Sequence, residues 1–270
     1  MTLEFRAEDE PHQLLRPNFL FYGPPKSGKT TAGVSYPGNV ILLNADLPNA
    51  TRYAKRQAKA RGTNVLEVKW PPANEERIVK TFDTMVSVMQ AVADQDAAYA
   101  KGEPPKDPIA AVQIDPVGNL YARLLEELGK RAISPSLPTY QAVGTHIERF
   151  CRALCESPSV SAIIVAHDMP VKDESNGEVE RLPNTGTTNP TLGQKLMGMV
   201  DIVGYTGVAA PEEGDDKPRY MAQLVSHAGR RGGDRWGVLG DARELDLAEW
   251  LEVIKAAEQP DTTTTKKGSK

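Results

Sequence analysis

The chain has 270 residues, of which 40% are hydrophobic and 25% are charged, and its formal net charge is −4. These values are typical of a globular protein with one large α/β core. No apolar run approaches the ~20 residues of a membrane-spanning helix, and the acidic residues 1–10 lack the apolar centre of a signal peptide. We therefore expect a cytoplasmic protein with no membrane partner, and the net charge by itself does not indicate nucleic-acid binding.

The first predicted elements surround a glycine-rich turn. The apolar and aromatic run 18–22 predicts a buried strand, and the small residues 31–35 can open a helix. Between them, residues 23–30 read Gly-Pro-Pro-Lys-Ser-Gly-Lys-Thr, which fits the phosphate-binding P-loop pattern G-x-x-x-x-G-K-[ST]. A strand, this turn and a helix in succession form the geometry that phosphate binding requires, so the match predicts a nucleotide site.

The P-loop gives each of its residues a task. Backbone N–H groups of the turn converge on phosphates, and the helix N-terminus adds a partial positive charge. Lys29 is expected to reach the β- and γ-phosphates, and the Thr30 hydroxyl is expected to ligate Mg²⁺. The predicted nucleotide-binding residues are Gly23, Pro24, Pro25, Lys26, Ser27, Gly28, Lys29, Thr30 and Thr31. ATP and Mg²⁺ are the predicted cofactors. The lack of a GTPase-type Asn-Lys-x-Asp motif favours ATP over GTP, and the sequence leaves this choice of nucleotide open.

The segments that follow alternate between strands and helices. Apolar runs predict strands at 40–44, 65–68 and 109–115, and helical patterns occupy 49–61, 75–100, 117–132 and 138–156. Such alternation predicts a mainly parallel sheet with helices on both faces.

The last third of the chain predicts an antiparallel addition to that sheet. A buried strand at 162–167 leads into a polar segment expected to be a loop at 170–190 and a short helix at 191–199; strands at 202–208 and 220–226 flank an acidic turn, and a helix at 245–258 closes the domain. The two late strands predict a hairpin at one sheet edge. We expect a single domain over 17–258, between a flexible lead-in at 1–16 and a disordered tail at 259–270.

Three polar side chains follow predicted strands and are candidate catalytic residues. Asp115 ends the apolar strand 109–115, the pattern of a Walker B aspartate that holds Mg²⁺. Asp46 lies just past the second strand, where a carboxylate can orient or deprotonate the attacking water, although an aspartate there can equally cap a turn. His167 ends a later strand, where it can face the γ-phosphate or serve as an ordinary turn histidine.

Basic residues form three groups with open interpretations. They are Arg230, Arg231 and Arg235 in a glycine-rich segment; Arg52, Lys55, Arg56 and Lys59 on one side of a predicted helix; and Lys172 and Arg181 in the polar segment 170–190. The first group suits phosphate recognition, either across a subunit interface or on a nucleic-acid backbone. The helical group can track a phosphate backbone or simply form a solvated face.

The two cysteines, Cys151 and Cys155, lie one helical turn apart in the 138–156 pattern. Because no third cysteine is present, they cannot complete a thiolate metal site, and buried free thiols are expected.

The combination of motifs resembles a known group. The P-loop with its Pro-Lys-Ser interior, Val112–Asp115, Val165–Asp168, Gly193–Lys195 leading to 199–203, and Gly229–Gly237 are similar to the RecA-like AAA-domain ATPases of bacteriophages, including the Sak-type single-strand annealing proteins. The resemblance covers about 17–255. It implies a RecA-like P-loop NTPase fold, Asp46 in the place of a catalytic glutamate, His167 as γ-phosphate sensor, and 169–190 as a DNA-binding loop.

The resemblance further implies arginines that reach a neighbour's ATP from the Gly229–Gly237 segment, and therefore a homo-oligomer. The sequence thus favours a Mg²⁺-dependent ATPase of phage-type DNA recombination or annealing. Its expected partners are single-stranded DNA and a separate single-strand-binding protein. Two alternatives stay open: a nucleotide-gated assembly factor with little turnover, consistent with the shorter Asp46, and a small-molecule P-loop kinase.

Overall fold

The computed structural model describes residues 15–47, 49–68, 80–129, 135–172, 177–187, 189–211 and 218–258. Its strands are β1 Phe19–Gly23, β2 Asn39–Asn44, β3 Asn64–Val68, β4 Ile109–Asp115, β5 Ser161–Lys172, β6 Val179–Asn184, β7 Ile202–Ala209, β8 Arg219–Gln223, β9 Gly233–Asp234 and β10 Ala242–Glu244. Its helices are α1 Lys29–Gly33, α2 Arg52–Ala60, α3 Lys80–Ala100, α4 Val117–Leu128, α5 Leu137–Cys155, α6 Thr191–Met199 and α7 Leu247–Glu258.

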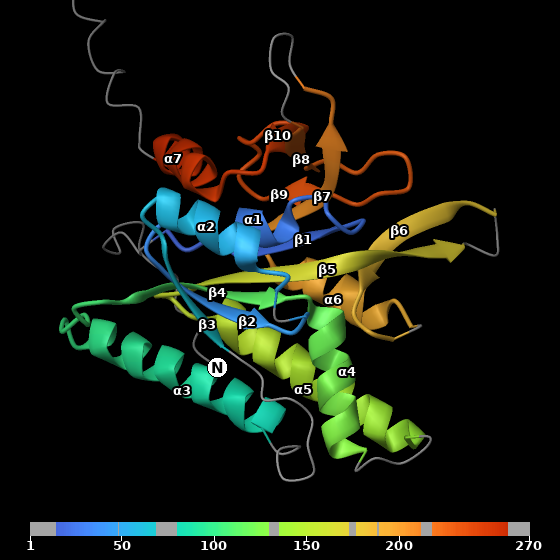
Figure 1. The fold of residues 1–270 in the computed structure, drawn as a ribbon, viewed down its shortest axis with the longest axis horizontal. Coiled ribbons are helices and arrows are strands. Elements are labelled where there is room, and N and C mark those ends of the chain that lie inside the picture. Colours follow the sequence, from blue (N-terminus) through green and yellow to red (C-terminus); the bar gives the residue numbers. More distant parts are fainter. Residues whose placement is uncertain are drawn as a thin grey trace, which may run out of the picture.

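One twisted sheet runs through the molecule, with helices on both of its faces (Figure 1). The strands lie in the order β10-β8-β7-β1-β5-β4-β2-β3, with β6 paired to β5 and β9 to β7. The pairs among β7, β1, β5, β4, β2 and β3 are all parallel. The predicted α/β class and mainly parallel sheet are therefore confirmed.

The central strand β1 shows why the core has two halves. All five of its residues are buried. Because successive side chains of a strand point to opposite faces, Leu20 and Tyr22 join the cluster under α4 and α5, while Phe19 and Phe21 pack against Trp250 of α7. A strand covered on both faces must be apolar throughout, which is the continuous run that the sequence displays.

The antiparallel edge hairpin is also confirmed. β7 pairs with β8 antiparallel, with Thr206 opposite Ala222, and β10 adds a further antiparallel strand beyond β8. The predicted strand at 220–226 is shorter in the structure, ending at Gln223, whose amide donates to the carbonyl oxygens of Val225 and His227. The short strand β10 was not predicted, since three residues, of which two are exposed and one is half-exposed, carry little periodicity.

The prediction of a loop at 170–190 is wrong over much of this segment. β5 continues past His167 to Lys172 and pairs antiparallel with β6, so the two strands form a hairpin that extends beyond the parallel sheet (Figure 1). Residues 168–172 are half-exposed or exposed. A strand that projects from the helical layers lacks the apolar run of the core strands, and this is why its sequence resembles a loop.

The remaining boundaries differ by a few residues. The helix expected at 49–61 begins at Arg52, and the one expected at 117–132 ends at Leu128, where Gly129 follows. The expected start of the 75–100 helix, the 1–14 part of the lead-in and the tail at 259–270 lie outside the described residues. Cys151 is buried, Cys155 is half-buried, and both are free thiols.

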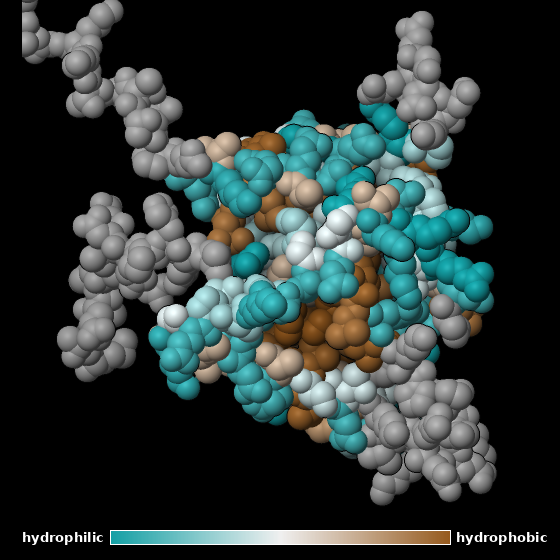
Figure 2. All heavy atoms as spheres, turned by 60° about the vertical axis from the view of Figure 1, so that its left-hand side comes forward, coloured by the Kyte–Doolittle hydropathy of each residue, from teal (hydrophilic) through white to brown (hydrophobic). Residues whose placement is uncertain are grey.

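The other sheet edge ends at β3. Figure 2 shows hydrophobic side chains gathered on the face where β3 lies between α2 and α3, and Leu66 of β3 is 65% exposed. Among the described helices, none combines the length and the apolar character needed to cross a membrane.

Candidate functional site

The P-loop forms the turn between β1 and α1. Gly28, the residue before α1, has a φ of 87°, a left-handed conformation that side chains disfavour. A Cβ at Gly28 would lie 2.7 Å from the Cβ of Tyr220, so this position also lacks room for any larger residue. Glycine is required here both for the turn and for the close approach of β8.

The Lys29 ammonium is held inside the turn. It donates hydrogen bonds to the carbonyl oxygens of Gly23 at 2.8 Å and Pro24 at 2.6 Å, and to the Ser27 hydroxyl at 3.1 Å. Burial lowers the pKa of Lys29 to about 8, against the opposing effect of the nearby Asp115 charge. Lys29 therefore already lies at the phosphate-binding turn, and an anionic ligand there would favour its protonated, charged form.

Asp115 and Thr30 meet beside Lys29. Asp115 ends β4, and its buried carboxylate accepts a hydrogen bond from the Thr30 hydroxyl. Burial raises the pKa of Asp115 to about 6, although the Thr30 hydrogen bond and the Lys29 charge act in the opposite direction. The nearby Lys29 charge is thus not enough to offset the burial of the Asp115 carboxylate, and a cation would stabilise it. A carboxylate next to a hydroxyl is also the hard oxygen donor set that Mg²⁺ prefers. The residues present thus fit the predicted metal.

Gln113 is a site residue that the sequence analysis missed. It lies two positions before Asp115 on β4, and so on the same face, and its Nε2 donates to Asp115 Oδ2 at 3.1 Å and to the Thr30 carbonyl at 3.3 Å. A Cβ on Gly33 of α1 would lie 2.3 Å from the Gln113 side chain. The sequence signal that could have found it is a polar amide within an otherwise apolar strand. The structure shows that this amide is fully buried, at the position where β4 faces the P-loop helix.

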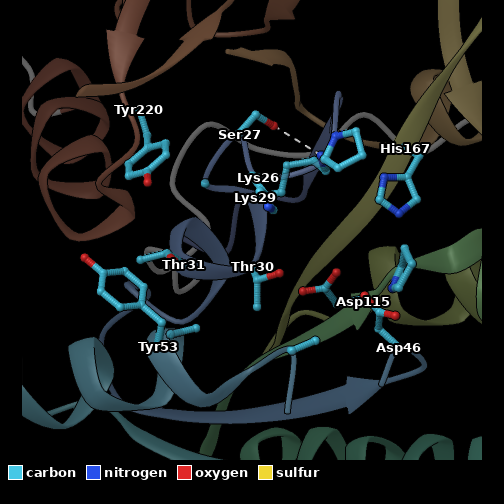
Figure 3. Close-up of a pocket in the computed structure, with 15 residues that line it drawn as sticks. Lys26, Ser27, Lys29, Thr30, Thr31, Asp46, Tyr53, Asp115, His167 and Tyr220 are labelled. Atoms are coloured by element: carbon cyan, nitrogen blue, oxygen red, sulfur yellow. Dashed lines mark hydrogen bonds between the residues drawn. The ribbon is translucent and has the colours of Figure 1, made fainter. Parts of the chain in front are cut away.

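A cavity of about 560 Å³ surrounds the P-loop. Figure 3 shows Asp46, Asp115 and His167 at one end of it, on the far side of the turn from Tyr53 and Tyr220. The three candidate residues at strand ends are therefore brought together, as the sequence predicts. Asp46 and Asp115 are neighbours because β2 and β4 pair in parallel and end side by side.

His167 faces the cavity from β5. Its Nδ1 is buried and has no hydrogen-bond partner within the described part of the chain. Burial lowers the pKa of His167, and the Lys29 charge adds to this effect. The imidazole is thus neutral near pH 7 and has an unused polar nitrogen, which suits a group that senses a phosphate oxygen.

Tyr53 and Tyr220 were not predicted as site residues. Tyr53 lies on α2 and is 52% exposed, and Tyr220 lies on β8. Both rings border the cavity at the end opposite His167 (Figure 3). Only the tertiary structure brings these two residues, 167 positions apart in the sequence, to one place.

The arginines of the 229–237 segment do not line this cavity. Arg231 pairs with Glu180 at 2.8 Å, Arg235 pairs with Asp201 at 3.0 Å, and the Arg230 guanidinium lies 4.7 Å from the centre of the Tyr205 ring. All three are engaged within their own chain. A role toward a neighbouring subunit stays a prediction.

The other two basic groups divide into paired and exposed residues. Arg52, Arg56 and Lys59 are exposed on α2, and Lys172 is exposed on the β5–β6 hairpin. Lys55 pairs with Glu67 at 2.7 Å, and Arg181 pairs with Asp168 at 3.1 Å. The proposed basic face of α2 therefore has three exposed cations, while the fourth turns toward β3.

The lowered pKa of Lys29 predicts a pH dependence of nucleotide binding. With a pKa of about 8, Lys29 is mostly charged at pH 7 and mostly neutral at pH 9. Bound phosphates raise this pKa, so binding above pH 8 takes up a proton, and affinity at pH 9 is expected to be about tenfold lower than at pH 7. Titration of a fluorescent ATP analogue across this range measures the effect. Lys29→Arg, whose guanidinium stays charged, should flatten the profile; a flat wild-type profile would contradict the assignment.

Two solved structures with some likeness to the chain are an ATP synthase subunit, NeqB, from Nanoarcheaum equitans and the flagellar accessory protein FlaH from Methanocaldococcus jannaschii. NeqB has 12% identity to this chain and a TM-score of 0.44, and the match covers 71% of this chain and 45% of NeqB. FlaH has 9% identity and a TM-score of 0.37, over 81% of this chain and 84% of its own. Because both TM-scores are below 0.5, neither likeness carries the assignment.

No curated protein matches this sequence. The family of AAA domains, in contrast, matches residues 16–236, a stretch that contains the P-loop, Asp115 and the whole parallel sheet. On this match, and on a site that places Lys29, Thr30 and Asp115 together at a P-loop, the chain belongs to the AAA-domain family of P-loop proteins.

Proposed function

We propose that this AAA-domain protein binds ATP with Mg²⁺ and hydrolyses it to ADP and phosphate. The observation that carries the proposal is the layout of the cavity, in which one P-loop separates an aromatic end from an end with two carboxylates and a histidine (Figure 3). A nucleoside triphosphate has the same polarity, with a flat base at one end and the reacting phosphate at the other.

That polarity gives ATP one orientation. The base lies between Tyr53 and Tyr220, whose rings supply an apolar stacking surface. The phosphates follow the backbone N–H groups of residues 26–30, and the γ-phosphate lies toward His167 and Asp46.

Hydrolysis then follows from the placement of four side chains. Thr30 and Asp115 would hold Mg²⁺, which when bound supplies positive charge to the β- and γ-phosphates. Lys29 stabilises the negative charge that develops on the transferred group. Water forms a bond to the γ-phosphorus as the bond from this phosphorus to the β–γ bridging oxygen breaks. Asp46 orients the water and accepts its proton, which passes to solvent.

We also propose that this turnover serves phage-type DNA recombination or annealing, with single-stranded DNA as the ligand of a homo-oligomer and a single-strand-binding protein as its partner. The resemblance to phage RecA-like proteins supports this, together with two surfaces next to the site. β5 continues from His167 into a hairpin with the exposed Lys172, and α2 carries Tyr53 among three exposed cations. A change at the γ-phosphate can therefore reach a nucleic-acid surface over a few residues.

A nucleotide-gated assembly factor is the second candidate. One oxygen of Asp46 accepts a hydrogen bond from the Leu47 backbone N–H at 2.8 Å. A short carboxylate already engaged by its own turn is less free to activate water than a longer one. This observation favours slow turnover, with ATP acting chiefly to change assembly.

Hydrolysis of ATP with and without single-stranded DNA separates the candidates. The recombination ATPase requires Mg²⁺-dependent phosphate release that rises with DNA, and DNA retention at low salt that falls as salt increases. Oligomers that form with ATP while phosphate release stays negligible would favour the assembly factor. Phosphate transfer to a nucleoside or nucleotide acceptor instead of water would establish the kinase. Turnover indifferent to DNA, without DNA retention, would contradict the DNA role alone.

A further inference from the structure

Glu67 is a buried carboxylate outside the nucleotide cavity, near the end of the edge strand β3. Its side chain is only 8% exposed. It accepts hydrogen bonds from Asn44 Nδ2 at 2.7 Å, the Thr51 hydroxyl at 2.9 Å and Lys55 Nζ at 2.7 Å. Burial by itself would raise the pKa of Glu67, but the Lys55, Asn44 and Thr51 hydrogen bonds outweigh it and hold the pKa below its usual value. Glu67 is therefore an ionised centre that joins β2, β3 and α2.

One branch of this network leads to Asp46. Asn44 donates its amide NH₂ to Glu67, and its Oδ1 accepts the backbone N–H of Asp46 at 3.0 Å. Asn44 is 5% exposed, so solvent is a poor substitute for either partner. Because a carboxylate can only accept, Glu67 fixes which end of the Asn44 amide faces the Asp46 backbone.

The other branch leads to Tyr53. Thr51 directly precedes α2, yet its hydroxyl donates to Glu67 and makes no capping bond to the helix. Lys55, one turn further along, donates to the second oxygen of the same carboxylate. Glu67 thus holds the first turn of α2 on both sides of Tyr53, which borders the cavity at its aromatic end.

We propose that Glu67 is a positioning residue of the nucleotide site, which holds the Asp46 turn at the phosphate end and α2 with Tyr53 at the base end in one fixed arrangement. The inference rests on the ATP function proposed above. Because a shift of about 1 Å in a reacting group can lower a rate by a hundredfold, a residue that touches no ligand can control both turnover and binding.

Glu67→Ala removes the acceptor from both branches. We expect kcat to fall by about tenfold to a hundredfold and the Kd for ATP to rise severalfold. The two branches are separated by double-mutant cycles. In an Asp46→Asn background, Glu67→Ala should lower kcat no further; in a Tyr53→Ala background, it should weaken ATP binding no further. If Glu67→Ala only destabilised the fold, it would cause the same further loss of kcat in the Asp46→Asn background, and of affinity in the Tyr53→Ala background, as it causes in the wild type.

Conservative variants guard against a loss of folding. Glu67→Gln keeps one oxygen for Asn44 and Thr51 but turns an amide NH₂ toward Lys55, so Glu67→Gln with Lys55→Met should restore most of kcat and affinity. If Glu67→Ala does not fold, Glu67→Gln replaces it in the Tyr53 cycle, because this variant disturbs the Lys55 contact, and Asn44→Leu, which removes the amide between Glu67 and the Asp46 backbone, replaces it in the Asp46 cycle. Glu148→Ala is the matched control, because Glu148 is likewise a carboxylate held by side-chain donors, Arg152 and Lys195, but lies on α5 and does not line the cavity. The kcat and Kd of this variant should equal those of the wild type.

The outcomes distinguish this inference from the function on which it rests. A wild type that binds no ATP contradicts the function, and the inference falls with it. If the wild type binds ATP without hydrolysing it, the Asp46 branch has no effect on turnover and that part of the inference is wrong. The Tyr53 cycle then decides whether Glu67 controls ATP binding. Wild-type kcat and Kd in Glu67→Ala, or additive losses in both cycles, overturn the inference while the ATPase stands.

Discussion

Lys29→Ala is expected to abolish ATP hydrolysis, with kcat lowered by at least about 100-fold. The Lys29 ammonium lies within the P-loop, 2.6 Å from the Pro24 carbonyl, and no other described cation lines the cavity except the exposed Lys26. Its loss removes the charge that stabilises the transferred phosphate, and no neighbour can replace it at the same place. Phosphate release under saturating ATP and Mg²⁺ measures the effect.

Two controls make this result specific. Lys255→Ala removes a lysine that pairs with Glu252 on the surface of α7, and it should leave turnover unchanged. The thermal midpoint of nucleotide-free Lys29→Ala shows whether the P-loop still folds, since the ammonium also bonds three groups of that turn. A folded Lys29→Ala protein that keeps wild-type turnover would show that the chemistry occurs elsewhere.

Asp115→Asn is expected to have opposite effects on activity and stability. Activity should fall by about 100-fold or more, because the amide is a poor ligand for the Mg²⁺ held with Thr30. The nucleotide-free protein should nevertheless be more stable than the wild type at pH 8. The pKa of Asp115 is raised from 3.8 to about 6 in the fold, so the folded protein carries a buried charge at pH 8 at a cost that asparagine does not incur.

The sign gives a pH window for the stability effect. Between pH 4 and 6 the folded wild type holds a proton on Asp115 that the unfolded chain has lost, so the contribution of Asp115 to the free energy of unfolding falls as pH rises through this range and changes no further above it. The difference in stability between Asp115→Asn and the wild type should therefore grow from pH 4 to 6. Each kcal/mol of difference in the free energy of unfolding corresponds to about 2–4 °C in thermal midpoint. Asp94→Asn, on the exposed face of α3, is the control and should change neither quantity. A less stable Asp115→Asn would contradict the burial argument.

Excess Mg²⁺ and ATP provide an independent measurement. A ligand that binds only the folded state raises the free energy of unfolding with its concentration. The thermal midpoint of the wild type should rise on adding both, and the midpoint of Asp115→Asn should rise much less. Equal shifts in the two proteins would mean that Asp115 does not support the bound metal.

The site divides clearly into what local sequence patterns could and could not predict. The P-loop is contiguous, so its fit to the pattern in residues 23–30 predicts both its shape and its chemistry. Asp115 and His167 were found because parallel strands bring their carboxyl ends to one edge, and an apolar run that ends in a polar residue marks such an end. Tyr220 carries no such mark, because its position over Gly28 depends on how β8 pairs with β7.

The hairpin of β5 and β6 was missed for a related reason. Hydrophobic periodicity reports burial, and a strand that leaves the core is held by main-chain pairing and contacts such as the Arg181–Asp168 ion pair, neither of which leaves a periodic pattern. The same holds for Arg231 and Arg235, whose partners Glu180 and Asp201 come from distant segments.

The sequence by itself determined the α/β class, the P-loop and the strand-end carboxylate that accompanies it, because these depend on short-range spacing and on the burial of continuous strands. The tertiary structure alone decided the polarity of the site, with Tyr53 and Tyr220 at one end and His167 at the other. It alone also revealed that Glu67 joins Asn44 to α2. These contacts connect residues from separate strands and helices, and the strand order that brings them together is a property of the whole sheet.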